Sequence, residues 1–228
     1  MTSTKFTAIG RRESNSGRIA LLAGAAVATA ATAAHATLTF SFDEMAFAAA
    51  ATNSDDFSAY LTPGDGDLDL TGGPTQLGDF IYTPIGSTDG FGDLEIRDPG
   101  AGDPAEDNSL FAFLDGSPDN FSFSITSASG LPFNGFGANF TSAASFGGTT
   151  VSLDNGDSFN IGDQLADPAT GFLGWTSDTT FSTITFSVTN DSDFEGIFFE
   201  TIYADIVPTP GVLSIAGLAG VAAARRRR

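Results

Sequence analysis

Cysteine is absent from this chain of 228 residues, and His35 is its only histidine. Without cysteine the chain forms no disulfide, so an exported form would depend on its core or on bound ions for stability. The only lysine, Lys5, and His35 both precede residue 37. If the first 36 residues are removed, the rest cannot support Ser-His-Asp or Cys-His catalysis, histidine-ligated zinc or lysine Schiff-base chemistry.

Basic residues are also nearly missing from the middle of the chain. Between residues 37 and 206 Arg97 is the only base, whereas 27 of the 28 acids lie there, so this segment carries a net charge of −26. Contacts to phosphate require lysine or arginine. This balance excludes nucleic acid and anionic membranes as partners and favours cations.

Amphipathic helices of useful length are not evident, and only residues 44–51 allow one short helical turn. Apolar residues instead recur at every second position in the segments 37–42, 121–126 and 184–188, which is typical of half-buried strands. Further strands are predicted at 79–83, 110–114, 136–140, 149–153 and 196–207. Short strands at this spacing, separated by turn signals, predict an all-β domain over residues 37–206, a β-sandwich of jelly-roll type.

The first 36 residues have the layout of a secretory signal peptide. Bases continue to Arg18, an apolar run follows from Ile19 to Ala34, and Ala34-His35-Ala36 forms a small-x-small cleavage site. We expect signal peptidase to cut after Ala36. An uncleaved membrane helix is the alternative reading of the same apolar run.

Residues 207–228 end the chain with two prolines, a short apolar run and four arginines. The run from Val212 to Ala224 would reach about 20 Å as a helix, short of a hydrocarbon core of about 30 Å. Arginines can extend this reach by snorkelling to headgroups, and the positive-inside rule places them in the cytoplasm. We therefore expect a marginal membrane helix flanked by Pro208, Pro210 and the basic cluster Arg225, Arg226, Arg227 and Arg228. A buried C-terminal helix is the alternative.

The terminal stretch VPTPGVLSIAGLAGVAAARRRR resembles the PEP-CTERM sorting signal of bacterial surface proteins. Pro208, Thr209 and Pro210 match its Pro-Glu-Pro motif except that Thr209 replaces glutamate. The resemblance implies recognition by an exosortase, transient anchoring in the inner membrane, and then transfer to the cell surface or extracellular matrix. It implies no particular activity.

Acidic residues gather in the segment 62–73, where Asp65, Asp67 and Asp69 stand at alternate positions with Gly64 and Gly66 nearby. Hard oxygen ligands at such spacing are typical of calcium sites. The segment does not fit an EF-hand, so a solvated acidic loop is the alternative. Asp65, Asp67 and Asp69 are thus the candidate calcium ligands.

These features predict a non-enzymatic envelope or matrix protein with a structural or adhesive role. A carbohydrate-binding module that binds extracellular polysaccharide is the alternative, and it predicts that Trp175, Tyr60 or Tyr82 is exposed. Next to apolar neighbours, Trp175 is predicted to belong to the core. A glycoside hydrolase ranks third, and its carboxylate pair would come from Glu44, Glu95, Glu106, Glu195 and Glu200.

Overall fold

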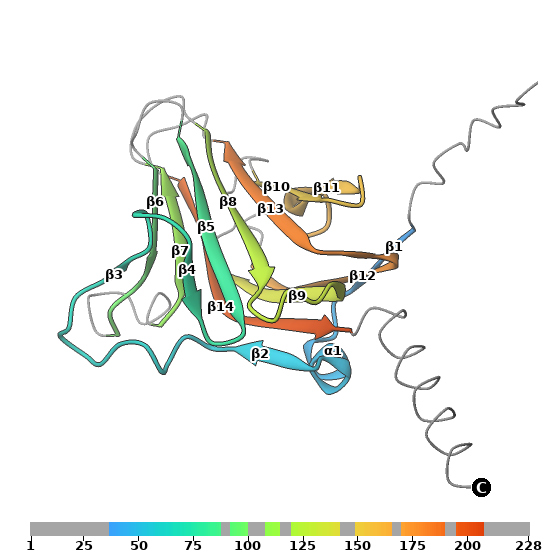
Figure 1. Ribbon diagram of the computed structural model, residues 1–228, viewed down its shortest axis with the longest axis horizontal. Helices are drawn as coiled ribbons and strands as arrows, with labels where there is room; N and C mark the ends of the chain where they lie inside the picture. Colours follow the sequence, from blue (N-terminus) through green and yellow to red (C-terminus); the bar gives the residue numbers. More distant parts are fainter. Residues whose placement is uncertain are drawn as a thin grey trace, which may run out of the picture. The chain divides into compact units, whose positions relative to one another are not determined.

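The computed structural model describes residues 37–87, 92–99, 108–114, 120–141, 149–165, 170–189 and 195–207. In these ranges the chain forms two antiparallel sheets (Figure 1), so the all-β prediction is confirmed. The first sheet runs in the order β1 (Leu38–Ser41), β12 (Gly171–Phe181), β9 (Phe133–Thr141), β14 (Glu195–Ile206), β7 (Leu110–Leu114), β6 (Gly92–Ile96) and β3 (Leu68–Asp69), and β2 (Asn53–Asp55) also pairs with β14. The second runs β11 (Ser158–Asn160), β10 (Thr149–Leu153), β13 (Thr183–Thr189), β8 (Asn120–Ser127), β5 (Phe80–Ser87) and β4 (Thr75–Leu77).

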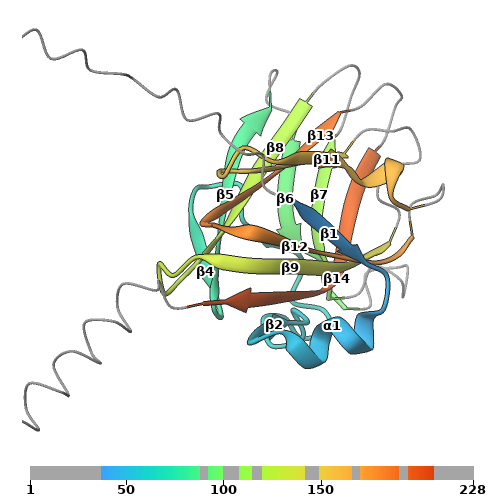
Figure 2. The ribbon, with the colours of Figure 1, turned by 90° about the vertical axis from the view of Figure 1, so that its right-hand side faces the viewer.

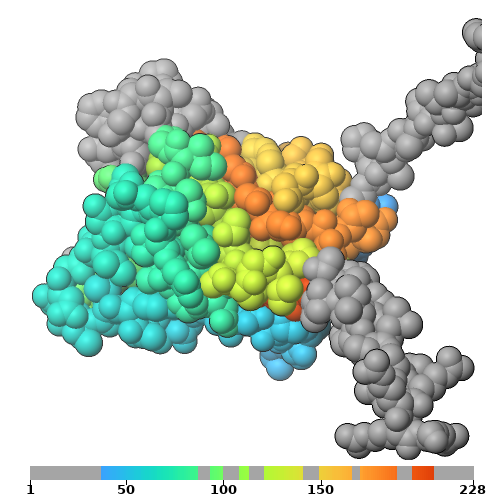
Figure 3. Space-filling view, viewed as in Figure 1, coloured from blue at the N-terminus to red at the C-terminus, as the bar shows by residue number. Residues whose placement is uncertain are grey.

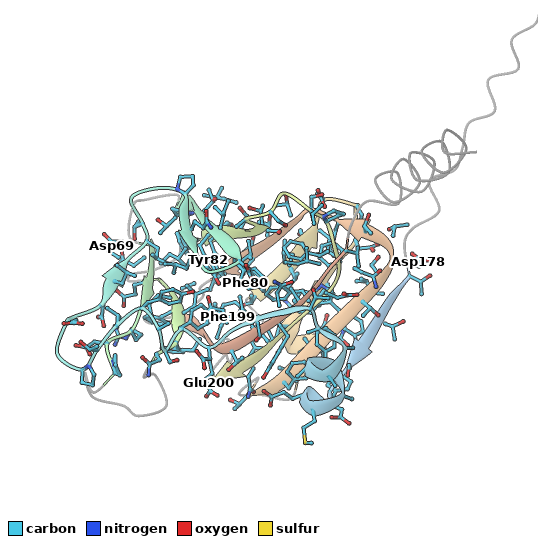
Figure 4. All side chains as sticks on the ribbon, turned by 60° about the horizontal axis from the view of Figure 1, so that its bottom comes forward. Asp69, Phe80, Tyr82, Asp178, Phe199 and Glu200 are labelled. Carbon is cyan, nitrogen blue, oxygen red and sulfur yellow. The ribbon has the colours of Figure 1, made fainter. Side chains whose placement is uncertain are left out.

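Phenylalanine fills the core between the sheets. The alternating apolar residues of β8 and β13 are completely buried, as their period of two predicts. Their rings meet the other sheet edge to face: the ring centroid of Phe199 on β14 lies 5.0 Å from that of Phe186 and 5.8 Å from that of Phe123. Phe80, Tyr82 and Phe199 are labelled in this interior in Figure 4.

Trp175 on β12 is fully buried, which confirms the prediction that it belongs to the core. Its ring lies 5.2 Å from that of Phe136 and 5.0 Å from that of Phe159. The alternation in the segment 37–42 also predicts that Phe42 lies on the buried face of the strand, and this prediction is wrong, because Phe42 is 58% exposed. Strand β1 ends at Ser41, and the chain then turns into the cap of the next helix, so Phe42 no longer follows the strand's alternation.

Helix α1 (Glu44–Ala50) covers part of the outer face of the first sheet, beside β12 and β14 (Figure 2). It begins at Asp43, whose carboxylate accepts a hydrogen bond from the Ala46 amide at 3.0 Å. The Phe47 ring lies against two glycines, Gly137 on β9 and Gly174 on β12, where any β-carbon would come within 3.0 Å of it. These glycines therefore allow the helix to approach the sheet closely.

Strand β14 is the longest strand described and lies inside its sheet rather than at an edge. It pairs with β9 on one side, and with β7 and then β2 on the other. A register shift between Phe199 and Thr201 leaves Glu200 as an extra residue opposite β9. The last strand of the fold is thus fixed along both sides.

Candidate functional site

The residues predicted to direct export and sorting lie outside the described residues: Ala34, Ala36, Pro208, Thr209, Pro210, Arg225, Arg226, Arg227 and Arg228. Within the described ranges, no helix has both the length and the apolar character needed to span a bilayer. What the structure does describe is the point at which the folded chain reaches this tail.

The end of β14 is held by neighbours on both sides. The amide of Ile206 donates to the Thr52 hydroxyl at 2.9 Å, and the amide of Thr52 donates to the Ala204 carbonyl at 3.0 Å. The amide of Val207 donates to the Pro132 carbonyl at 2.9 Å. Backbone hydrogen bonding therefore continues to the residue immediately before Pro208.

The acidic segment 62–69, here called the acidic loop, folds around the carboxylate of Asp98. This side chain is 7% exposed and accepts hydrogen bonds from the amides of Gly64, at 3.0 and 3.1 Å to its two oxygens, and Gly66, at 2.8 Å. Both glycines have positive φ, of 92° and 82°, which a side chain would disfavour. Sequence analysis missed Asp98, because more than thirty positions separate it from the glycines.

The three candidate calcium ligands each bond to protein groups near them. Asp65 accepts hydrogen bonds from the amide of Thr62 at 3.0 Å and from the hydroxyl of Thr62 at 2.5 Å. Asp67 accepts one from the amide of Asp98 at 2.8 Å. Asp69 accepts one from the amide of Thr71 at 2.7 Å. Side-chain and backbone hydrogen bonds from the neighbouring threonines lower the pKa of Asp65 and of Asp69. Among the described residues no three acidic side chains gather closely enough to hold a metal ion. A calcium site here stays a prediction.

Arg97 joins the acidic loop to strand β6. Its guanidinium lies 2.7 Å from Glu95 and 3.3 Å from Asp67, and it stacks over the Phe111 ring at 5.1 Å from the centroid. Burial raises the pKa of Glu95, while the hydrogen bond from Arg97 opposes that rise. The only base between residues 37 and 206 therefore serves as a local structural link.

The described candidate hydrolase glutamates lie on three different elements, α1, β6 and β14. Glu44 on α1 accepts from the Tyr203 hydroxyl at 2.8 Å and from the side-chain amide of Asn139 at 3.3 Å. Glu95 is held by Arg97, and Glu200 lies on β14, where Figure 4 labels it. Glu106 and the side chain of Glu195 lie outside the described residues. Burial and the bond to Glu44 raise the pKa of Tyr203 to about 12.

A pocket of about 220 Å³ lies beside the end of β14 and is here called the exit pocket. Four separate segments supply its lining: Thr52 and Asn53, Asp79, Ser127 with Ser129 and Leu131, and Ile206. On the face shown in Figure 3, the chain around the β8–β9 connection borders the segment that contains β4 and β5. None of the described glutamates lines this pocket.

A half-buried acid lies close to the exit pocket. Asp55 accepts from the Tyr60 hydroxyl at 2.5 Å and from the Phe57 amide at 2.9 Å, yet burial raises its pKa. The hydroxyl of Tyr82 is completely buried and has no hydrogen-bond partner among the described residues. Burial also raises the pKa of Tyr82 and of Tyr60.

Comparison with known proteins finds no family model that matches the chain and no curated protein that is significantly similar to it.

Proposed function

We propose that this chain is an exported bacterial protein of the cell surface or extracellular matrix, with a structural or adhesive role. Its signal peptide is removed by signal peptidase, and its tail anchors it briefly in the inner membrane until an exosortase processes the Pro-Thr-Pro segment. The observation that carries this proposal is where the described strands begin and end: β1 begins at Leu38 and β14 ends at Ile206, so every described strand lies between the two predicted processing segments.

This placement supports the proposal because both cuts would leave the paired strands intact. A cut after Ala36 lies ahead of β1, and a cut near Pro208 follows the last backbone hydrogen bond of the described chain, from Val207. The domain that remains is a β-sandwich of jelly-roll type in this proposal. Its support is the strand order, in which β14 lies between β9 and β7 and β13 lies between β10 and β8.

A carbohydrate-binding module with an aromatic platform receives less support. Trp175 and Tyr82 are completely buried, and Tyr60 is partly buried with its hydroxyl on Asp55. A glycoside hydrolase needs two carboxyl groups across one cleft, whereas Glu44 and Glu95 are each bonded to other protein groups. The non-enzymatic role is therefore the one proposed.

The proposal is tested by replacing both motif prolines, Pro208→Ala with Pro210→Ala, in the producing cells. We expect the wild-type protein in the surface or medium fraction without its tail, and the variant in the membrane fraction with Arg228 retained. Pro63→Ala with Pro74→Ala is the matched control and should be sorted like wild type, because both prolines are exposed, Pro63 in a turn and Pro74 just before β4. If the motif variant is released as efficiently as wild type, exosortase sorting is wrong.

A further inference from the structure

We propose that the exit pocket binds a single neutral sugar ring, supplied as a unit of an extracellular polysaccharide. This inference rests on the proposed adhesive role and names the chemistry of its ligand. The pocket's volume of about 220 Å³ lies below the roughly 300–1,000 Å³ typical of sites for larger molecules, so it suits one ring rather than a longer ligand.

The lining offers the two kinds of surface that a sugar presents. Asp79, Asn53 and Ser129 provide a carboxylate, an amide and a hydroxyl, which can exchange hydrogen bonds with ring hydroxyl groups. Leu131 and Ile206 provide aliphatic surface for the C–H groups of the ring. A carboxylate acceptor forms stronger hydrogen bonds than a neutral one, so Asp79 is the residue expected to contribute most to affinity.

Hydrogen bonds between neighbouring walls hold the pocket in shape before any ligand arrives. Asn53 donates its side-chain amide to Asp79 at 2.6 Å, and the Asp79 carbonyl accepts from the amide of Ala128 at 2.9 Å. On the other side, the Thr52 hydroxyl accepts from the amide of Ile206 at 2.9 Å. A preorganised site loses little conformational entropy when it binds, which favours a weakly held ligand such as a sugar.

Charge disfavours acidic sugars as ligands. Asp79 is a carboxylate in the lining, and the segment 37–206 has a net charge of −26 with Arg97 as its only base. Arg97 is bonded to Glu95 and Asp67 and does not line the pocket. An acidic sugar would meet like charge without a cation to offset it.

The test is saturation-transfer NMR with the full-length chain in a detergent that has no sugar headgroup. The probes are methyl glycosides of glucose, galactose and mannose, with methyl glucuronide as the acidic comparison. For a ligand of this size we expect a dissociation constant of about 1 mM for at least one neutral probe. Asp79→Ala should weaken that binding at least tenfold, whereas Asp163→Ala, which removes an exposed acid on η1 (Ile161–Asp163), should leave it unchanged.

Three results would overturn the inference. The first is no saturation-transfer signal from any neutral probe at concentrations well above the expected dissociation constant. The second is an equal loss of affinity in Asp79→Ala and Asp163→Ala, and the third is binding of the glucuronide as tight as that of the neutral probes. A soluble neutral polysaccharide of the bound sugar should compete with the glycoside. Failure to compete would refute the polymer as the source. Because purified protein is used, the result does not depend on sorting, so a failure here is distinct from a failure of the proposed export.

Discussion

Replacing Gly174 with alanine tests how helix α1 docks on the first sheet. The new β-carbon would lie 2.6 and 2.7 Å from two carbons of the Phe47 ring and 3.1 Å from the Phe172 ring. Ordinary carbon contacts need about 3.5–4.0 Å, so Phe47 must move by about 1 Å. Overpacking of this kind costs about 1–3 kcal/mol. The cost of Gly174→Ala has a similar upper limit, because helix α1 can detach from the sheet instead of being overpacked. Detachment would lose the burial of Phe47, which is worth about 1.5–3 kcal/mol.

The free energy of unfolding is measured by urea titration, with Trp175 as the fluorescent probe, because it is the only tryptophan and is fully buried. Gly72→Ala is the matched control, since its β-carbon would meet no atom within 4 Å and its φ is not left-handed. We expect this control to stay within about 1 kcal/mol of wild type. In a Phe47→Ala background, Gly174→Ala should lose most of its cost. An unchanged cost in that background, or a single variant as stable as wild type, would refute the docking geometry.

Four further predictions follow from individual side chains. Asp98→Ala should lower the free energy of unfolding by about 2–4 kcal/mol, because the amides of Gly64 and Gly66 lose a charged acceptor. The control Asp163→Ala should change the free energy of unfolding by at most about 0.5 kcal/mol. Equal effects of the two variants in urea titrations would contradict this prediction. Tyr203 has a pKa of about 12, and the pKa of each other tyrosine is also raised. The stability that the neutral tyrosines contribute should therefore be intact below pH 10 and decline as the pH rises through these pKa values. Absorbance at 295 nm in the folded protein should show no phenolate near pH 10. An inflection of this absorbance near pH 10 in the folded protein would contradict the burial of the tyrosines. Burial raises the pKa of Asp55, so the stability that this group contributes is present below about pH 3.8 and declines as the pH rises. Asp55→Asn should therefore gain stability relative to wild type between pH 3.8 and 7. A relative loss of stability in urea titrations over this range would contradict the direction of the shift. If the acidic loop holds calcium, adding the ion to chelated protein should raise the thermal midpoint; a rise no larger than NaCl gives at equal ionic strength would rule the site out.

Strands with one fully buried apolar face and one more accessible polar face were the most predictable part of the fold. β8 and β13 alternate between buried apolar and more accessible serine or threonine positions, so their period is visible in the sequence. Strand β12 was not predicted as such because α1 and neighbouring rings cover its outer side. Phe172, Leu173, Gly174 and Trp175 are consecutive buried residues, which removes the alternation. A contact between distant segments thus hid the local pattern.

The acidic loop shows the corresponding limit for sites. Alternating aspartates and glycines predicted carboxylates directed at an ion, but spacing alone does not reveal where the backbone amides point. In the structure the amides of Gly64 and Gly66 bind the carboxylate of Asp98. The exit pocket was equally inaccessible to sequence analysis, because its lining comes from four segments between Thr52 and Ile206 that share no motif.

The most direct test of the proposed function is the intact mass of the protein recovered from its own cells, with membrane, surface and medium fractions measured separately. The account predicts a surface or medium species that begins at Thr37 and lacks the residues after Pro210. A single membrane-bound species that still ends at Arg228 would contradict it, because the tail would then be a permanent anchor.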